Sequence, residues 1–320
     1  MFIQEIFLHL FLLIVGFILL IKGASFFADG AAAIASKLRV PRRAAGMAAD
    51  LLAVSVPGAG ISIAAAWREN PDIAAGNIIG GNMISLLLIA GLAALISPLS
   101  SGGSVRTELT FMMISVVFFT VYGTAAGEFS AYSGIFMICL FTVFLLFLFI
   151  RRKKEKGSVS IRYRDEAFLR EEKEPSGRLF LFAVIGLVAV VLGSDLAVEN
   201  AASAAVMIGV SERFFALTLI SLGTSLPVLI TCIRAVLRGH FGTVTAQITG
   251  SVLFRTLFVA GASGLAGPVV LGGSFLTDSI LCVAAAAVFL FFCRRGTVSR
   301  SAGFLLLILY AAYLFYLLCC

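Results

Sequence analysis

Six long stretches of this 320-residue chain contain no Asp, Glu, Lys or Arg. They are residues 73–105, 109–127, 129–150, 214–233, 256–277 and 301–320. A helix of about 20 apolar residues crosses the roughly 30 Å hydrocarbon core of a bilayer. Because 60% of the residues are hydrophobic and 13% are charged, a soluble fold could not shield so much apolar side chain from water. The sequence predicts a polytopic membrane protein.

The apolar runs, separated by Pro, Gly and charged clusters, predict an all-α fold of about ten transmembrane helices. The expected positions are near 4–36, 41–67, 72–98, 108–126, 130–150, 178–207, 212–238, 242–268, 273–293 and 302–319. The first apolar segment has no basic residues before it, so we expect a retained span rather than a cleaved signal peptide.

The basic residues indicate how these helices are oriented. Twenty of the 24 Lys and Arg residues flank one set of predicted helix ends, and only Arg68 and Arg213 flank the other set. Basic residues favour the cytoplasmic side of the cell membrane, so both termini should lie on its outer side. The basic residues of 151–178 are mixed with six acids, which is typical of a solvated loop and argues against a nucleic-acid partner. Residues 151–177 are therefore predicted to be a cytoplasmic linker.

The chain repeats itself at a constant offset, the one that separates Gly23 from Gly193. The identities that occur at this offset without a gap include Gly23 with Gly193, Val40 with Val210, Ser55 with Ser225, Pro57 with Pro227, Gly80 with Gly250, Gly91 with Gly261, and Pro98 with Pro268. Each unit, residues 1–150 and residues 178–320, holds five predicted helices. An odd number of spans places the second unit upside down, which is the inverted repeat of many secondary transporters.

Two prolines at equivalent positions of the repeat predict breaks in the second and seventh helices. Pro57 and Pro227 each lack the amide that would bond the carbonyl one helical turn earlier, so Ala53 and Gly223 keep free oxygens. Polar backbone at membrane depth persists only where it is buried in protein or lines a polar cavity. The matched positions favour a binding site near the bilayer midplane over two unrelated kinks.

Two amides also occupy equivalent positions, Asn77 in the third helix and Gln247 in the eighth. Amide side chains at membrane depth are costly unless they find partners. They are expected either to bridge helices or to contact a solute, and the small residues around them permit close packing.

The chain resembles the calcium/cation antiporter superfamily, whose best-known members are the sodium/calcium exchangers. The residues that carry the resemblance are Gly76-Asn77-Ile78-Ile79-Gly80, Gly193-Ser194-Asp195 and Gly223-Thr224-Ser225-Leu226-Pro227. The resemblance covers all ten predicted spans. It implies two inverted repeats around an ion site, no cofactor, and glutamates after the two prolines that ligate sodium or calcium together with the third and eighth helices.

The match fails at the ligands themselves. Gly58 and Val228 stand where the family glutamates are expected, and Ser85 stands at the Asn-like position of the third helix. Its counterpart on the eighth helix, often acidic in the family, is Arg255. Thr224 and Ser225 match the family pattern in the second repeat.

These departures change the expected chemistry. Calcium prefers six to eight oxygen ligands with carboxylates among them, and a guanidinium does not deprotonate. We therefore expect no tight calcium site and no resident metal. The candidate transport-site residues are Asp50, Ser55, Gly58, Asn77, Ser85, Thr224, Ser225, Val228, Gln247 and Arg255.

A buried arginine should have a partner, because its charge is expensive to place at the bilayer centre. Asp50, the only acid of the second helix, is the expected partner, with Asp29, Asp195 and Glu199 as alternatives. The remaining possibility is that Arg255 extends away from the membrane centre toward water.

The function predicted from these features is secondary transport by alternating access, with altered ion selectivity. The solute is a small inorganic ion or another small solute, including an anion attracted by Arg255. The alternative is a transport-inactive relative with a structural or regulatory membrane role. No HExxH, G-x-S-x-G or P-loop motif suggests an enzyme. The oligomeric state is left open.

Overall fold

The computed structural model describes residues 2–37, 42–100, 105–154 and 176–319, and within these ranges the chain forms ten helical segments. Five precede the linker: α1 (Phe2–Lys37), α2 (Arg42–Trp67), α3–η1–α4 (Pro71–Met83, Ile84–Ile89, Ala90–Ile96), α5 (Val105–Ala126) and α6 (Ala131–Lys154). Five follow it: α8 (Ser176–Ile208), α9–η2–α10 (Glu212–Phe215, Ala216–Ile220, Ser221–Leu237), α11–η3–α12 (Phe241–Leu253, Phe254–Val259, Ala260–Ala266), α13 (Phe275–Arg294) and α14 (Arg300–Cys319).

Nine of the described segments are long and apolar enough to cross a membrane, and the apolar part of α2 described here, Leu52–Trp67, is shorter. The prediction of an all-α polytopic membrane protein is confirmed. Most of the predicted linker, residues 155–175, lies outside the described part of the chain.

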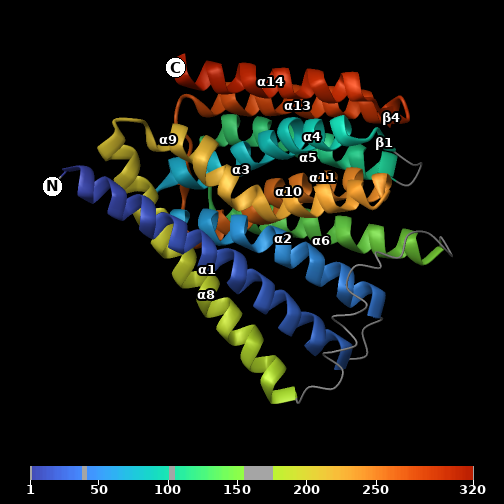
Figure 1. Ribbon diagram of the computed structural model, residues 1–320, viewed down its shortest axis with the longest axis horizontal. Helices are drawn as coiled ribbons and strands as arrows, with labels where there is room; N and C mark the ends of the chain where they lie inside the picture. Colours follow the sequence, from blue (N-terminus) through green and yellow to red (C-terminus); the bar gives the residue numbers. More distant parts are fainter. Residues whose placement is uncertain (1, 38–41, 101–104, 155–175, 320) are drawn as a thin grey trace.

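The helices are arranged around the third and eighth spans. Residues Pro71–Ile96 and Phe241–Ala266 are the most buried spans: about four-fifths of the residues in an apolar 18-residue stretch of each lie inside the protein. In Figure 1, α13 and α14 lie along one side, while α1 and α8 pack side by side and extend obliquely from the rest. Both termini lie at the same end of the bundle.

Two short strand pairs reveal the symmetry of the fold. Strand β1 (Leu99–Ser100) pairs antiparallel with β4 (Thr297–Val298), and β2 (Glu128–Phe129) pairs antiparallel with β3 (Val269–Val270). Each pair joins one half of the chain to the other. Strands β1 and β2 lie at opposite ends of α5, and β3 is the repeat counterpart of β1, so the same contact occurs once at each end of the bundle. This is the arrangement that two inverted repeats produce.

The third and eighth helices also share a local irregularity. Both widen into a π-helical turn, Ile84–Ile89 in η1 and Phe254–Val259 in η3, and the repeat offset relates the two turns. Such π segments are rare and occur frequently at functional sites. Ser85 and Arg255 stand at the second position of these two turns. The seventh helix has a further π segment, η2, before α10, whereas the equivalent residues 46–50 belong to the α-helix α2.

The prolines interrupt hydrogen bonding rather than the helices. α2 continues through Pro57 and α10 continues through Pro227, so the chain does not unwind at either position. Transmembrane helices tolerate proline where neighbouring helices and hydroxyl side chains satisfy the freed backbone groups. The predicted breaks of the second and seventh helices are thus limited to the amide donors that the two prolines lack.

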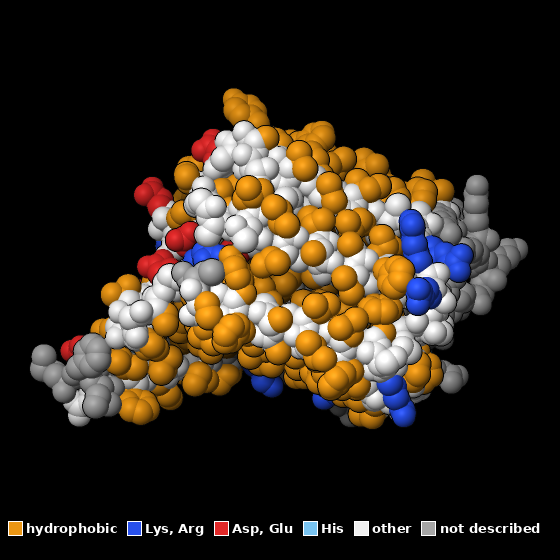
Figure 2. All heavy atoms as spheres, turned by 90° about the horizontal axis from the view of Figure 1, so that it is seen from above, with side chains coloured by type: hydrophobic (Ala, Val, Ile, Leu, Met, Phe, Trp, Pro, Cys, Tyr) orange, Lys and Arg blue, Asp and Glu red, His pale blue; other side chains and the backbone are white. Residues whose placement is uncertain are grey.

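Charges gather at the two ends of an otherwise apolar surface (Figure 2). The acidic end, which carries both termini, displays the exposed residues Glu69, Asp72 and Glu128. The basic end displays Arg106, Arg234, Arg238, Arg294, Arg295 and Arg300. The surface between them exposes large hydrophobic side chains such as Phe7, Phe136 and Phe304, as a lipid-facing surface requires.

Candidate transport site

Arg255 lies in the centre of the protein and is only 4% exposed. Its Nη1 donates to the backbone oxygen of Gly81 at 2.7 Å and to Ser85 Oγ at 2.8 Å. Its Nη2 donates to Ser225 Oγ at 2.9 Å. The three acceptors come from α3, η1 and α10, so the guanidinium joins the two repeats. Arg255 does not extend toward water.

Two glycines shape the space around this guanidinium. A Cβ on Gly81 would lie 2.8 Å from Nε and 2.9 Å from Cζ of Arg255, so any other residue here would require the Arg255 side chain to shift. A Cβ on Gly58 would lie 3.8 Å from Nε of Arg255 and 3.8 Å from Cβ of Thr224, an ordinary contact. The position where the family carries its first glutamate therefore faces Arg255 and accepts a small side chain.

Asn77 forms a second polar cluster beside Arg255. Its Nδ2 donates to the backbone oxygen of Gly58 at 2.9 Å and to Ser62 Oγ at 2.8 Å. Its Oδ1 accepts a hydrogen bond from Thr224 Oγ1 at 2.9 Å. Asn77 and Thr224 are fully buried. The amide thus bridges α2, α3 and α10, and both its nitrogen and its oxygen are hydrogen-bonded.

Gln247, the counterpart of Asn77, lies apart from this cluster. Its Nε2 donates to Thr231 Oγ1 at 2.6 Å, and its Oε1 accepts from Cys232 Sγ at 3.5 Å. Gln247 thus bridges α11 to α10, one of the two roles expected of the amides, and its place in the transport site stays a prediction. The physical reason that Gln247 lies apart is local: Thr224 has Val54 as its counterpart, which offers Gln247 no hydroxyl. Gln247 bonds to its own neighbouring helix instead.

Sequence reasoning missed Ser62 and Cys232, although the repeat offset relates them. Each is the neighbour to which the amide of its own repeat bonds. Their matched positions in the two repeats could have identified them. A hydroxyl and a thiol can both form hydrogen bonds, so each was a possible partner for the amide of its repeat.

The remaining candidates lie on the two proline-containing helices. Ser55 Oγ is buried and has no hydrogen-bond partner among the described residues. Val228, at the second family glutamate position, is 1% exposed and packs in the hydrophobic core. The side chain of Asp50 lies outside the described residues.

Two of the alternative acidic partners of Arg255 are engaged elsewhere. Asp195 and Glu199 contact Arg68, at 2.5 Å and 3.2 Å respectively, near the acidic end. In the part of the chain that the structure describes, no ion pair joins Arg255 to a carboxylate, Asp29 included. Among these residues the guanidinium is held by neutral oxygen atoms alone.

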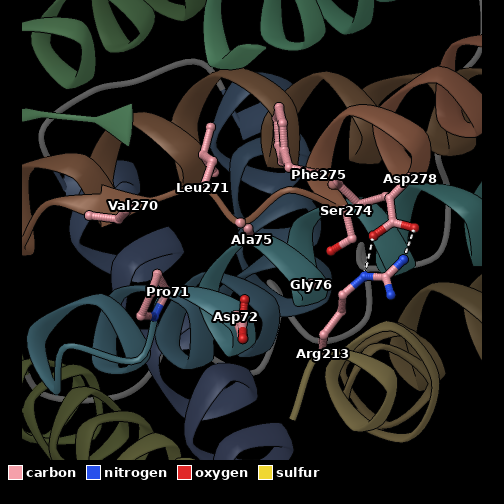
Figure 3. Close-up of a pocket in the computed structure, with 12 residues that line it drawn as sticks. Pro71, Asp72, Ala75, Gly76, Arg213, Val270, Leu271, Ser274, Phe275 and Asp278 are labelled. Atoms are coloured by element: carbon pink, nitrogen blue, oxygen red, sulfur yellow. Dashed lines mark hydrogen bonds and ion pairs between the residues drawn. The ribbon is translucent and has the colours of Figure 1, made fainter. Parts of the chain in front are cut away.

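A second, half-buried arginine lies at the acidic end, in the small pocket of Figure 3. Arg213 Nε and Nη2 donate to the two carboxylate oxygens of Asp278 at 2.7 Å and 2.6 Å. Asp278 is 2% exposed. The pocket beside the pair also includes Asp72 and Gly76 and has a volume of about 20 Å³, which suits about one water molecule. The sequence signal for this pair was Asp278 itself, the one charged residue of 256–293.

Comparisons with known proteins agree with this architecture. A family model described as sodium/calcium exchanger protein matches residues 8–150 and residues 178–319. The inner membrane protein YrbG of Escherichia coli is 33% identical over 262 residues, which cover 80% of this chain and 79% of that protein. The sodium/calcium exchanger MaX1 of Methanosarcina acetivorans is 25% identical, covering 95% of this chain and 96% of its own.

A solved structure has the same fold. The sodium-calcium exchanger NCX_Mj, soaked with Na⁺ and Sr²⁺, aligns with a TM-score of 0.63 and 25% identity, over 96% of this chain and 98% of that one. The predicted resemblance to exchangers is confirmed by these matches.

Proposed function

This chain belongs to the sodium/calcium exchanger family, and on that premise we propose that it moves a small inorganic ion across the membrane by alternating access. Its relatives include a protein named as a sodium/calcium exchanger, and the exchanger NCX_Mj shares its fold. The solute class follows from this family.

The observation that carries the proposal is a buried polar site shared by both repeats. Asn77 and Ser85 come from the first repeat, and Thr224, Ser225 and Arg255 come from the second. The strand pairs relate the two halves by a pseudo-two-fold axis. When two inverted repeats exchange their conformations, a site between them opens first to one side of the membrane and then to the other.

The charge distribution supports a cation as the ion taken up at the acidic end. Glu69, Asp72 and Glu128 are exposed there, and a surface rich in one charge raises the local concentration of the opposite ion. The arginines of the basic end favour the cytoplasm for that end. In this orientation both termini lie outside the cell and residues 151–177 lie inside.

The site supports a selectivity that differs from calcium exchange. Gly58 and Val228 supply no carboxylate, and Arg255 places a fixed positive charge between the repeats. Two unit charges about 4 Å apart repel by about 4 kcal/mol at an effective dielectric constant near 20. A divalent cation next to Arg255 would experience about twice that repulsion, so we expect weak calcium binding.

The test is reconstitution of the purified protein into liposomes with imposed gradients of sodium, calcium, protons or chloride. We expect ion flux under at least one of these gradients, with weak competition by calcium. Asn77→Ala should reduce the flux strongly because it removes the bridge between three helices, whereas the matched Gln247→Ala should retain it. Absence of flux under every gradient would favour a transport-inactive role.

A further inference from the structure

We propose that the guanidinium of Arg255 is a tethered cation that occupies an oxygen cage between the repeats, in place of a mobile monovalent cation. The proposal rests on the site described above and assigns Arg255 as the residue that determines its ion selectivity. It concerns binding, which can be measured without transport.

The first argument is the chemistry of the cage. The three acceptors of Arg255 are one backbone carbonyl and two hydroxyls, at 2.7 to 2.9 Å from its nitrogens. Ser85 and Ser225 are at most 1% exposed, so these bonds are shielded from bulk solvent. Neutral carbonyl and hydroxyl oxygens around a positive charge are also the groups that replace the hydration shell of an alkali cation. The cage therefore suits a positive charge whether it is tethered or free.

The second argument is the symmetry of the repeat. The counterpart of Arg255 is Ser85, which already contributes an oxygen to the cage. A serine at position 255 would therefore give both repeats the same residue and add a further hydroxyl. The space vacated by the guanidinium lies against the backbone of Gly81, where an ion would meet the same carbonyl oxygen.

The third argument is a spare ligand on α2. Ser55 Oγ is buried and lacks a partner among the described residues. Ser55 precedes Gly58 by three positions, so both occupy one face of α2, and Gly58 lies next to Arg255 Nε. A buried hydroxyl without a partner is costly. A cation in the cage would use the oxygen that Arg255 leaves unbonded.

The tether has a direct consequence for binding. Because Arg255 cannot dissociate, a mobile cation never gains these oxygens in the wild-type protein. The cage should therefore bind no sodium, and removal of the guanidinium should create a sodium site.

The experiment measures sodium binding by purified protein in detergent, with thermal unfolding and isothermal titration of NaCl against choline chloride at constant ionic strength. For wild type we expect the same unfolding midpoint in both salts. For Arg255→Ser we expect a midpoint about 2–4 °C higher in sodium, at a concentration about five times the dissociation constant. Arg255→Asn serves as a second variant with the same expectation, should the serine variant fail to fold.

Matched variants separate the tethered charge from a merely structural role. Arg255→Lys keeps a positive charge in the cage and should show no sodium response. Adding Ser225→Ala to Arg255→Ser removes one cage oxygen and should weaken sodium binding at least tenfold. The proposal is overturned if a folded Arg255→Ser or Arg255→Asn protein shows no sodium-specific shift, or if Arg255→Lys gains the same shift.

The result does not depend on transport. A lack of flux by the wild-type protein in liposomes would contradict the proposed function and leave the sodium-binding result intact. Conversely, a carrier that transports ions while Arg255→Ser binds no sodium would contradict the tethered cation alone.

Discussion

Two arginines are held inside this protein in different ways. Arg213, near the acidic end, forms a bidentate pair with the buried carboxylate of Asp278. Arg255, at the centre, bonds to one carbonyl and two hydroxyls, and no described carboxylate pairs with it. The first charge is cancelled within a few ångströms, whereas the second is only solvated by neutral oxygens.

Under the proposal made above, the difference separates a structural contact from one that determines ion selectivity. A neutralised pair fastens α9 to α13 and presents little net charge to a passing ion. The positive charge of an arginine that only neutral groups solvate is not cancelled. Its electrostatic field therefore attracts anions and repels cations. We therefore expect Arg213 to contribute to stability at one end of the protein and Arg255 to influence ion binding at the centre, because only Arg213 has a described carboxylate beside it.

The largest expected effect is on the neutralised pair. Asp278→Asn should destabilise the protein by about 3 kcal/mol, the lower end of the range for buried pairs, because it leaves the half-buried Arg213 without its counter-charge. Thermal or denaturant unfolding in detergent measures the loss. Adding Arg213→Gln should restore part of the stability, and additive losses in this double-mutant cycle would show that the two side chains do not interact.

A smaller loss of unfolding free energy is expected where the broken hydrogen bonds join uncharged groups. Asn77→Leu should cost about 2–3 kcal/mol, since it leaves the backbone oxygen of Gly58 and the Thr224 hydroxyl without their partner. Gln247→Leu, in the partly exposed counterpart position, should cost about 1 kcal/mol or less. Unfolding of both variants under one condition tests the ranking, and equal losses would contradict the asymmetry of the two amides.

A still smaller change is expected at the central arginine. Arg255→Met keeps most of the side-chain volume and removes a charge that is expensive to bury, so the lost hydrogen bonds are offset. We expect the unfolding free energy to change by about 1 kcal/mol or less in either direction. A loss of about 3 kcal/mol or more would instead reveal a carboxylate partner, for which Asp50 is the first residue to substitute.

The smallest effect is expected at the exposed cluster of Arg68. Its side chain is 34% exposed, and those of Asp195 and Glu199 are 51% and 60% exposed. Arg68→Gln should therefore cost about 1 kcal/mol or less, and added salt should reduce the difference from wild type. Unfolding at low and high ionic strength measures both effects. A large, salt-independent loss would mean that this pair is shielded from water.

Particular residues show how far sequence reasoning reaches. Arg255 and Pro57 were identifiable because each is unusual in an apolar helix, and their repeat counterparts were identifiable by counting. The partner of Arg213 could have been predicted from the isolated acid at 278. The hydrogen-bond acceptors of Arg255 could not be predicted, because a backbone carbonyl such as that of Gly81 carries no sequence signature.

The sequence alone determined the membrane class, the ten helical segments and the two repeats. These follow from the lengths of uncharged runs and from one constant offset, and bilayer thickness converts such lengths into spans. Only the tertiary structure decided that Asn77 bridges three helices while Gln247 does not, and that neutral oxygens surround Arg255. The reason is physical: contacts between helices depend on how their faces pack, and residues distant in the chain share no local pattern that records it.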